Sequence, residues 1–263
     1  MKPKVGKIAF SNCEPVYHGF TVGALPRPFE LVGATPATLA TLLHRAELDI
    51  SPVSSTEYLA HRHLWDLVPG LCIASLGAVE SVCLFSRVPF EELSGRLVNL
   101  SPKSRTSNAL LGPLLHRLFG VRPTLALPAP GQEPAAFLAI GDEALLARGR
   151  PGHPFVLDLG QAWVELTGKP LVFAVWVARR PFRQREPQAA ERIQRLLVES
   201  KEMGKRELAQ VASYACGLSG QSRAECERYL RQLRFDLEEI DLAGLAEMER
   251  YLEASRRCAA EAG

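Results

Sequence analysis

The sequence predicts an α/β protein whose sheets are mainly parallel. Short apolar segments of strand length alternate with segments whose leucines recur at helical spacing, which is typical of sheets covered by helices. Several apolar segments also end in turns rich in serine, threonine, asparagine or aspartate. Ligands of such folds bind beyond the carboxyl ends of the strands, so these turns are the first candidates for a binding site.

In the first third of the chain, two helix starts are marked by capping residues. Thr35 precedes Pro36, which matches an N-cap followed by proline at the first helical position. Ser54 and Glu57 have the spacing of a capping box, so we expect a helix from there to about His63. A polar turn is predicted over residues 11–15, and strands over residues 5–10, 29–33, 48–53, 71–74 and 79–85.

The middle of the chain continues the alternation, and the last part is helical. The pattern predicts helices over residues 106–119 and 142–147, a loop over residues 128–134, and strands over residues 97–100, 124–127, 136–140, 155–157 and 171–178. From Pro187 onward it predicts helices with breaks at residues 217–220 and near residues 241–244. Such a helical tail suits a chain that crosses to a second lobe and returns.

Composition argues against several classes of protein. The net charge of +2 in 263 residues gives no electrostatic case for nucleic acid or an acidic membrane as a partner. The apolar run Ile8–Phe10 is too short for a signal peptide, and no run approaches the roughly 18 residues of a membrane span. The six cysteines contain no C-x-x-C pair, so we expect free thiols and a cytoplasmic protein.

The hydroxyl-rich segment Ser104, Arg105, Thr106 and Ser107 opens the predicted helix over residues 106–119. Backbone N–H groups at a helix start stabilise an anion, and the hydroxyls and Arg105 would add donors and charge. The segment is therefore a candidate site for a carboxylate. The alternative is an ordinary Ser/Thr-rich N-cap.

Asn12 and Ser81 are the candidates for contact with the reacting part of a ligand. Asn12 follows a predicted strand and can both donate and accept hydrogen bonds, although asparagine at such a position is also a common turn former. Ser81 lies in an otherwise apolar strand and could instead be a small hydroxyl that faces the core.

Three further polar residues at strand ends have a structural alternative. Ser54 and Ser55 are expected to cap a helix first and to line a ligand site second. Asp142 is a candidate general base, with a simple N-cap of the following helix as the alternative.

No metal site is expected from the histidine pattern. His61 and His63 are two residues apart, so on a helix they point to different faces. We therefore expect surface histidines. Cys13 follows Asn12, and a packed thiol is favoured there over a nucleophile.

Seven short segments together resemble the chorismate dehydratase family of menaquinone biosynthesis, which belongs to the futalosine route. They occur in the order seen in that family, and the resemblance covers nearly the whole chain. Relatives often begin this opening segment with Tyr-x-Asn or a similar aromatic start. This chain has Phe10 in the first position and keeps the asparagine as Asn12. The segments are Phe10–Pro15, Ile50–Tyr58, Gly77–Ser81, Ser104–Ser107, Ile140–Asp142, Asp158–Gly160 and Val172–Trp176.

The resemblance implies a two-lobed fold similar to type II periplasmic binding proteins, with a ligand cleft between the lobes. The expected lobes are residues 1–83 plus 178–263, which include the helical tail, and residues 84–177. Hinge strands are expected near residues 81–85 and 173–177. The resemblance also favours substrate contact for Asn12, Thr106 and Ser107.

The implied reaction is loss of water from chorismate to give 3-enolpyruvylbenzoate, with no metal or organic cofactor. Because the sequence offers no obvious base, we hypothesise that the enolpyruvyl carboxylate of the substrate removes the ring proton. Two alternatives stay open. One is the sister enzyme of the pathway that forms a dihydroxynaphthoate, and the other is a non-catalytic solute-binding protein for a small carboxylate.

Overall fold

The computed structural model describes residues 2–148 and 151–261, which divide by their contacts into two compact units. Unit 1 comprises Met1–Ala74 and Val172–Glu238, and unit 2 comprises Ser75–Leu171 and Glu239–Gly263. The chain therefore passes from one unit to the other three times, the third time before its last helix.

The predicted lobes differ from this division in three places. Residues 75–83 belong to unit 2, where Asp158 accepts hydrogen bonds from their backbone, and residues 172–177 belong to unit 1, where they pair with a strand. The last helix also belongs to unit 2, since the hydroxyl of Tyr251 donates to the carbonyl of Pro113 at 3.0 Å. Sequence periodicity could not reveal these long-range contacts.

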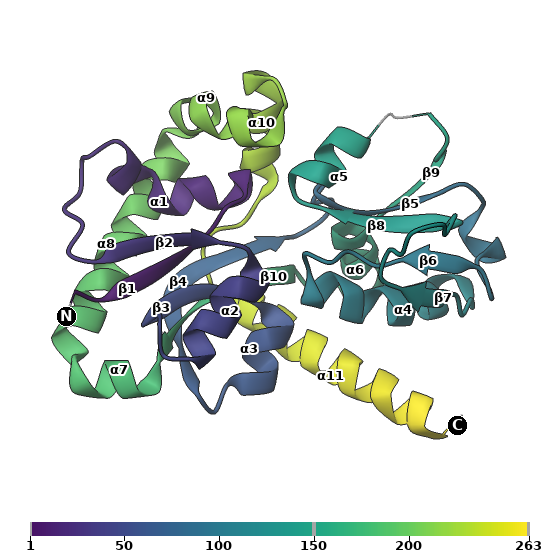
Figure 1. Ribbon diagram of the computed structural model, residues 1–263, viewed down its shortest axis with the longest axis horizontal. Helices are drawn as coiled ribbons and strands as arrows, with labels where there is room; N and C mark the ends of the chain where they lie inside the picture. The colour runs from purple at the N-terminus through teal and green to yellow at the C-terminus, as the bar shows by residue number, and fades with distance from the viewer. Residues whose placement is uncertain (1, 149–150, 262–263) are drawn as a thin grey trace. The chain divides into compact units, whose positions relative to one another are not determined.

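Unit 1 is built on a sheet with the strand order β2-β1-β3-β10-β4 (Figure 1). β1 runs parallel to β2 and β3, whereas β10 is antiparallel to β3. The strands are β1 (Lys4–Ile8), β2 (Glu30–Ala34), β3 (Ile50–Ser54), β4 (Trp65–Ser75) and β10 (Leu171–Arg179).

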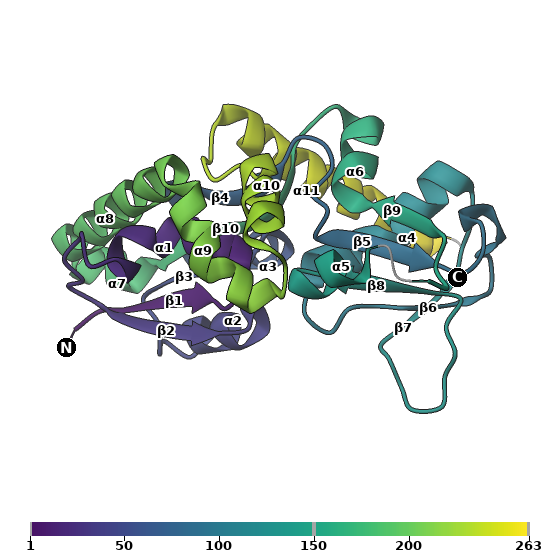
Figure 2. The same cartoon turned by 90° about the horizontal axis from the view of Figure 1, so that it is seen from above.

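Helices cover both faces of this sheet. α1 (Glu14–Thr21), α8 (Pro187–Arg206) and α9 (Leu208–Ser219) lie on one face, and α2 (Pro36–His44) and α3 (Ser55–His61) on the other (Figures 1 and 2). This is the arrangement that right-handed crossovers require. Two more helices, α7 (Arg180–Arg185) and α10 (Arg223–Gln232), complete the described helices of unit 1.

The first helix of unit 1 was not predicted. Residues 11–15 were expected to be a turn, but Ser11–Cys13 form a 3₁₀ turn that leads directly into α1. Pro15 lies in the first turn of α1, where a proline costs the helix no hydrogen bond. In contrast, the predicted cap at Thr35 is confirmed, because its side chain accepts a hydrogen bond from the backbone of Thr38.

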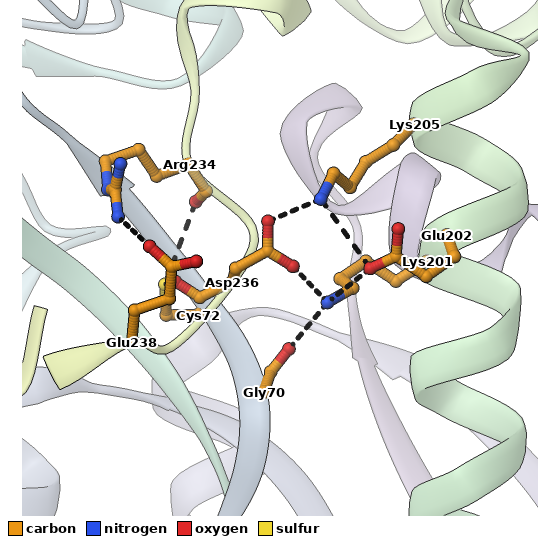
Figure 3. Close-up of polar contacts among 8 residues, drawn as sticks. All are labelled: Gly70, Cys72, Lys201, Glu202, Lys205, Arg234, Asp236 and Glu238. Carbon is orange, nitrogen blue, oxygen red and sulfur yellow. Dashed lines mark hydrogen bonds and ion pairs between the residues drawn. The ribbon is translucent and has the colours of Figure 1, made fainter.

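The segment that follows α10 is fastened to β4 within unit 1. Backbone bonds join Ala74 and Arg234 in both directions, and the buried Lys201 donates to the carbonyl of Gly70 at 2.9 Å. Figure 3 shows Asp236 between Lys201 and Lys205. Burial raises the pKa of Asp236, but the hydrogen bonds and charges of the two lysines outweigh it and leave this pKa below its usual value.

Unit 2 repeats the same order of strands with different segments of the chain. Its sheet is β7-β6-β8-β5-β9, in which β6 is parallel to β7 and β8, and β5 is antiparallel to both β8 and β9. The strands are β5 (Val82–Ser86), β6 (Leu97–Asn99), β7 (Thr124–Ala126), β8 (Ala136–Ile140) and β9 (Phe155–Asp158).

In each sheet the first strand after a crossing is antiparallel to a neighbour, β5 to β8 and β10 to β3, so the sheets are mixed. The prediction of parallel strands is confirmed for the three strands β1, β2 and β3 and for β6, β7 and β8. The exceptions are β10 and β5.

The helices of unit 2 also lie on both faces of their sheet. α4 (Arg105–Phe119), α6 (Leu159–Thr167) and α11 (Glu239–Glu261) gather on one face, and α5 (Asp142–Ala147) lies on the other (Figures 1 and 2). A 3₁₀ turn, η2 (Phe90–Glu92), follows β5. The described helices include none that is long and apolar enough to cross a bilayer.

The helix break predicted near residues 241–244 is wrong. α11 continues through Gly244, which packs so closely on Pro170 that a Cβ atom there would lie 2.4 Å from the proline carbonyl oxygen. The glycine therefore permits a close contact and does not end the helix. The actual interruption is residues 233–238, between α10 and α11.

Candidate functional site

The predicted site residues of unit 1 lie at one edge of its sheet. Because β1, β2 and β3 are parallel, their carboxyl ends meet at this edge. Asn12 comes shortly after β1, and Ser54 and Ser55 join β3 to α3. We call Asn12, Ser54 and Ser55 the polar edge of unit 1.

Asn12 offers an unused acceptor at this edge. Its Oδ1 atom is buried and has no hydrogen-bond partner among the residues that the structure describes. A buried acceptor left in this state costs about 1–3 kcal/mol, so such groups usually have a partner when the protein works. The side chain therefore suits a ligand that carries a hydroxyl or another donor.

Buried aromatic side chains hold the segment that carries Asn12. The hydroxyl of Tyr17 donates to the carbonyl of Gly6 at 2.6 Å and accepts from the indole of Trp176 at 3.0 Å. Burial raises the pKa of Tyr17 well above its usual value, so the phenol stays neutral and keeps both roles. Lys7 and Glu14 add an ion pair at 2.7 Å across the same segment.

The hydroxyls of Ser54 and Ser55 are engaged with the protein. Ser54 accepts from the backbone N–H of Glu57 at 3.3 Å, as the predicted N-cap of α3. Ser55 is buried and donates to the carbonyl of Val172 at 2.6 Å. These contacts join β3, α3 and β10, so both serines act first as structural residues of the polar edge.

The predicted site residues of unit 2 also share one edge. β6, β8 and β9 run in the same direction, so α4, α5 and α6 all begin at this edge. β5 runs the opposite way and starts there, because Val82 pairs with Ile140 at the end of β8. The polar edge of unit 2 consists of Ser81, Ser104, Arg105, Thr106, Ser107, Asp142 and Asp158.

The start of α4 is a rigid, buried helix terminus. Ser104 is its N-cap and accepts from the backbone N–H of Ser107 at 3.1 Å. Thr106 and Ser107 are buried, whereas Arg105 is exposed. The N-cap prediction is thus confirmed, and the first-turn N–H groups of this helix still favour an anion.

Asp158 is the residue of this edge that sequence reasoning overlooked. Its carboxylate accepts backbone N–H bonds from Gly160 and Gln161 of α6, at 2.9 and 3.1 Å. It also accepts from Val79 at 3.0 Å and from Glu80 at 2.7 Å. One side chain therefore fixes both the start of α6 and the turn that precedes Ser81. An aspartate directly before a new helix is an N-cap signal, but sequence does not show its second set of partners.

Ser81 is buried and is joined to the start of α5. Its carbonyl accepts from the N–H of Gly141 at 2.7 Å, and its own N–H donates to Val79 at 2.7 Å. Glu80 adopts a left-handed conformation with φ 60°, which costs free energy for a residue with a side chain. The bonds to Asp158 hold the turn in this conformation.

Asp142 is not the N-cap of α5. Gly141 takes that position with φ 62°, and Asp142 is the first helical residue. Asp142 lines a cavity of about 470 Å³ together with Lys103, Phe137 and His153. Of the described residues that line this cavity, Asp142 is the only predicted site residue.

Comparison with solved structures defines the class of fold. A protein from Archaeoglobus fulgidus is similar with a TM-score of 0.76 at 17% identity, over 96% of this chain and 97% of that one. The periplasmic aliphatic sulphonate binding protein of Escherichia coli is similar with a TM-score of 0.66 at 13% identity, over 98% and 87%. The protein therefore has a periplasmic-binding-protein-like α/β fold, as the sequence predicts.

Sequence comparison defines the family. A family model described as menaquinone biosynthesis matches residues 3–254. A relative from Thermus thermophilus named chorismate dehydratase is 32% identical, in an alignment that covers 93% of each chain. The chain belongs to this menaquinone biosynthesis family.

Proposed function

We propose that the protein is a chorismate dehydratase, which removes water from chorismate to give 3-enolpyruvylbenzoate. The observation that carries the proposal is its 32% identity to a chorismate dehydratase over 93% of the chain. The two polar edges support it, because they offer a buried amide oxygen, hydroxyls and helix N-termini for a small dicarboxylate.

The proposed reaction is an elimination that makes an aromatic ring. A ring C–H bond and the neighbouring C–O bond to the hydroxyl break, a C=C bond forms, and the proton and hydroxide leave as water. Aromatisation makes the step strongly downhill. The enzyme therefore has to orient the reacting groups and to assist the departure of the proton and the hydroxyl.

The start of α4 is proposed to bind one substrate carboxylate. Its first-turn N–H groups and the side chains of Thr106 and Ser107 supply donors, and Arg105 adds positive charge. Ser104 contributes by capping the helix, since its hydroxyl already bonds Ser107 at 2.9 Å. Ser54 and Ser55 are proposed as further substrate contacts.

Asn12 and Ser81 are the proposed catalytic residues. The amide of Asn12 can accept from the substrate hydroxyl and donate to it as it departs, which would give its unpartnered Oδ1 atom a use. Ser81 is proposed to bond the departing hydroxyl or a carboxylate, from a turn that Asp158 holds rigid.

The proton acceptor is proposed to be the enolpyruvyl carboxylate of chorismate itself. The alternative proton acceptor from the protein is Asp142, which would then also contact the substrate. A chorismate analogue without that carboxylate separates the two. Unchanged turnover of the analogue would reject the substrate-assisted step and favour Asp142.

We place the reaction in the cytoplasm, without a metal or organic cofactor and without a nucleic-acid or membrane partner. Cys13, Cys72, Cys83, Cys216 and Cys226 are thiols rather than disulfides, as expected in a reducing compartment. The side chain of Cys258 lies outside the described part of the chain.

The deciding experiment is incubation of the purified protein with chorismate, followed by liquid chromatography and mass spectrometry. We expect a product lighter by one water that keeps the enolpyruvyl group. Unchanged chorismate, beside an active relative as a positive control, would contradict the proposal. A screen with a cyclised futalosine and with small carboxylates would then distinguish the sister enzyme from a solute-binding protein.

A further inference from the structure

Two histidines and a glutamate converge in unit 1, none of them among the residues of its polar edge. His44 is the last residue of α2, and Glu57 and His61 lie one turn apart on α3. The Nε2 atom of His44 is 3.0 Å from Oε1 of Glu57, and the Nδ1 atom of His61 is 3.3 Å from the same oxygen. The two histidines end α2 and α3, whereas Glu57 lies in the first turn of α3, with its backbone N–H bonded to Ser54.

The three atoms have the spacing of metal ligands. Zn²⁺ binds imidazole nitrogens and carboxylate oxygens at about 2.0–2.2 Å in tetrahedral geometry, which puts neighbouring ligand atoms roughly 3.3–3.6 Å apart. Here all three atoms lie within 4.8 Å of one another. One cation can therefore contact all of them once the two imidazoles shift, by up to about 1 Å, toward tetrahedral spacing.

Local charge and packing favour a cation at this point. Glu57 is only 4% exposed, and both histidines belong to the last turn of a helix, where the backbone carbonyls carry partial negative charge. The buried ring of Trp65 packs against both imidazoles, with ring centroids 4.8 Å from His44 and 5.5 Å from His61. The imidazole edges stay about one-third exposed, which leaves a path for an ion.

The competing explanation is a purely structural cluster. The carboxylate of Glu57 can accept N–H bonds from both imidazoles, and Nδ1 of His61 also lies 3.0 Å from the backbone carbonyl of Glu57. Metal binding requires the lone pair of this Nδ1 atom to face the ion, so the contact with the carbonyl would be lost. The two explanations predict different behaviour in the presence of metal.

We propose that His44, Glu57 and His61 form a binding site for a divalent cation of the Zn²⁺ class, with Nε2, Oε1 and Nδ1 as ligands and a fourth position for water. Such an ion would join α2 to α3. The proposal does not depend on the proposed dehydratase activity, because none of the three residues belongs to a polar edge.

The test is a titration of tag-free, chelator-treated protein with Co²⁺, read by visible absorption and by tryptophan fluorescence. Tetrahedral Co²⁺ absorbs visibly, and an ion beside Trp65 should quench its emission. We expect saturation at one equivalent and displacement of Co²⁺ by Zn²⁺. Trp65→Phe should remove most of the quenching but keep the absorption.

Ligand variants locate the ion. His44→Gln and His61→Gln should each weaken binding by at least about 10- to 100-fold. Loss of a residue that only hydrogen-bonds to a metal ligand already has an effect of this size, and loss of a ligand itself should not have less. His63→Gln, a neighbouring histidine outside the cluster, is the matched control and should keep the affinity. Circular dichroism checks that each variant folds. If one of the two ligand variants does not fold, the affinity of the other tests the proposal.

Three results would overturn the proposal. They are the absence of saturable binding to the wild type, unchanged affinity in the folded ligand variants, and an intense thiolate-to-cobalt absorption band. The second result would mean an adventitious surface ion only, and the third would assign the ion to a cysteine.

Discussion

The two units have the same strand order, yet they hold their polar edges by different means. In unit 1, Asn12 lies in a 3₁₀ turn, and the elements on either side of it are joined by the Tyr17 hydroxyl and by the ion pair of Lys7 and Glu14. In unit 2, the charged carboxylate of Asp158 gathers backbone N–H groups from two segments at once. The same topology thus brings polar turns to one edge of each sheet, but the contacts that hold these turns in place differ between the two units.

The difference has a consequence for what each edge can offer a ligand. In unit 1 the Asn12 amide oxygen has no partner among the described residues, whereas the helix termini of unit 2 present N–H groups that attract negative charge. Unit 1 is therefore suited to a hydroxyl and unit 2 to a carboxylate, and the predictions below test this division of roles.

The largest effect is expected for Asn12→Ala. Loss of a group that assists charge development typically lowers kcat about 100- to 1,000-fold, and stability should be unchanged or slightly higher, because an unsatisfied buried oxygen is removed. Gln221→Ala is the matched control, since its Oε1 atom is also buried without a partner in the described structure. Dehydration rates and urea unfolding of both variants check the prediction. Equal rates for the two variants would contradict it.

In both units a helix glycine packs against a proline carbonyl. Substitution by alanine adds one carbon atom and tests whether this close packing matters to the same degree in each unit. In Gly204→Ala the new Cβ would lie 2.2 Å from the carbonyl oxygen of Pro15, and in Gly244→Ala 2.4 Å from that of Pro170. We expect each to lower the free energy of unfolding by about 1–3 kcal/mol.

Gly217→Ala is the matched control for these two variants. Gly217 lies within α9 with open space around it, so alanine there should stabilise by about 0.5–1 kcal/mol. Urea denaturation measures all three. A loss of stability in Gly217→Ala as large as that in Gly204→Ala would contradict close packing as the cause, because Gly217 has open space around it.

Asp158→Ala should affect both stability and activity. Loss of a helix cap costs about 1–2 kcal/mol, and the turn that carries Ser81 loses its anchor, so kcat should fall as well. Ser222→Ala removes the cap of α10 in unit 1 and should cost similar stability without changing kcat. Thermal unfolding and initial rates distinguish the two. Full activity in Asp158→Ala would contradict the proposal that Asp158 positions Ser81.

The smallest effect is a pH dependence within unit 1. The folded-state pKa of Asp236 is lowered, so its pairs with Lys201 and Lys205 stabilise the fold above the unfolded pKa of about 3.9. This stability is lost as the pH falls through the lower, folded pKa. Asp236→Asn should therefore be about 1 kcal/mol less stable than the wild type at neutral pH. The difference should shrink below about pH 4 in urea titrations, and a constant difference would contradict the assignment.

Local sequence signals predicted most strands and several helix starts. Thr35, Ser54 and Ser104 were identified as caps because an N-cap needs only a suitable side chain and the next few N–H groups. The strand over residues 136–140 and the helix over residues 142–147 were predicted with the observed bounds. The family resemblance was also sufficient to predict the fold class and the family.

The errors share one cause, which is that tertiary contacts changed the meaning of a local signal. Gly244 marks a close contact and not a break, and Pro15 lies inside a helix and not in a turn. α6 was missed although Asp158 caps it and Leu159, Ala162 and Trp163 lie on one buried face. Gly141, and not Asp142, caps α5, because its positive φ turns the chain.

By itself, the sequence determined which segments are strands and helices and which polar turns follow them, since these depend on neighbours along the chain. Only the tertiary structure decided that Asp158 anchors the turn before Ser81, that the Asn12 oxygen has no partner among the described residues, and that His61 packs closer to His44 than to His63. These contacts join residues far apart in the chain. Which of them form depends on strand register and helix packing, and no short sequence pattern encodes either.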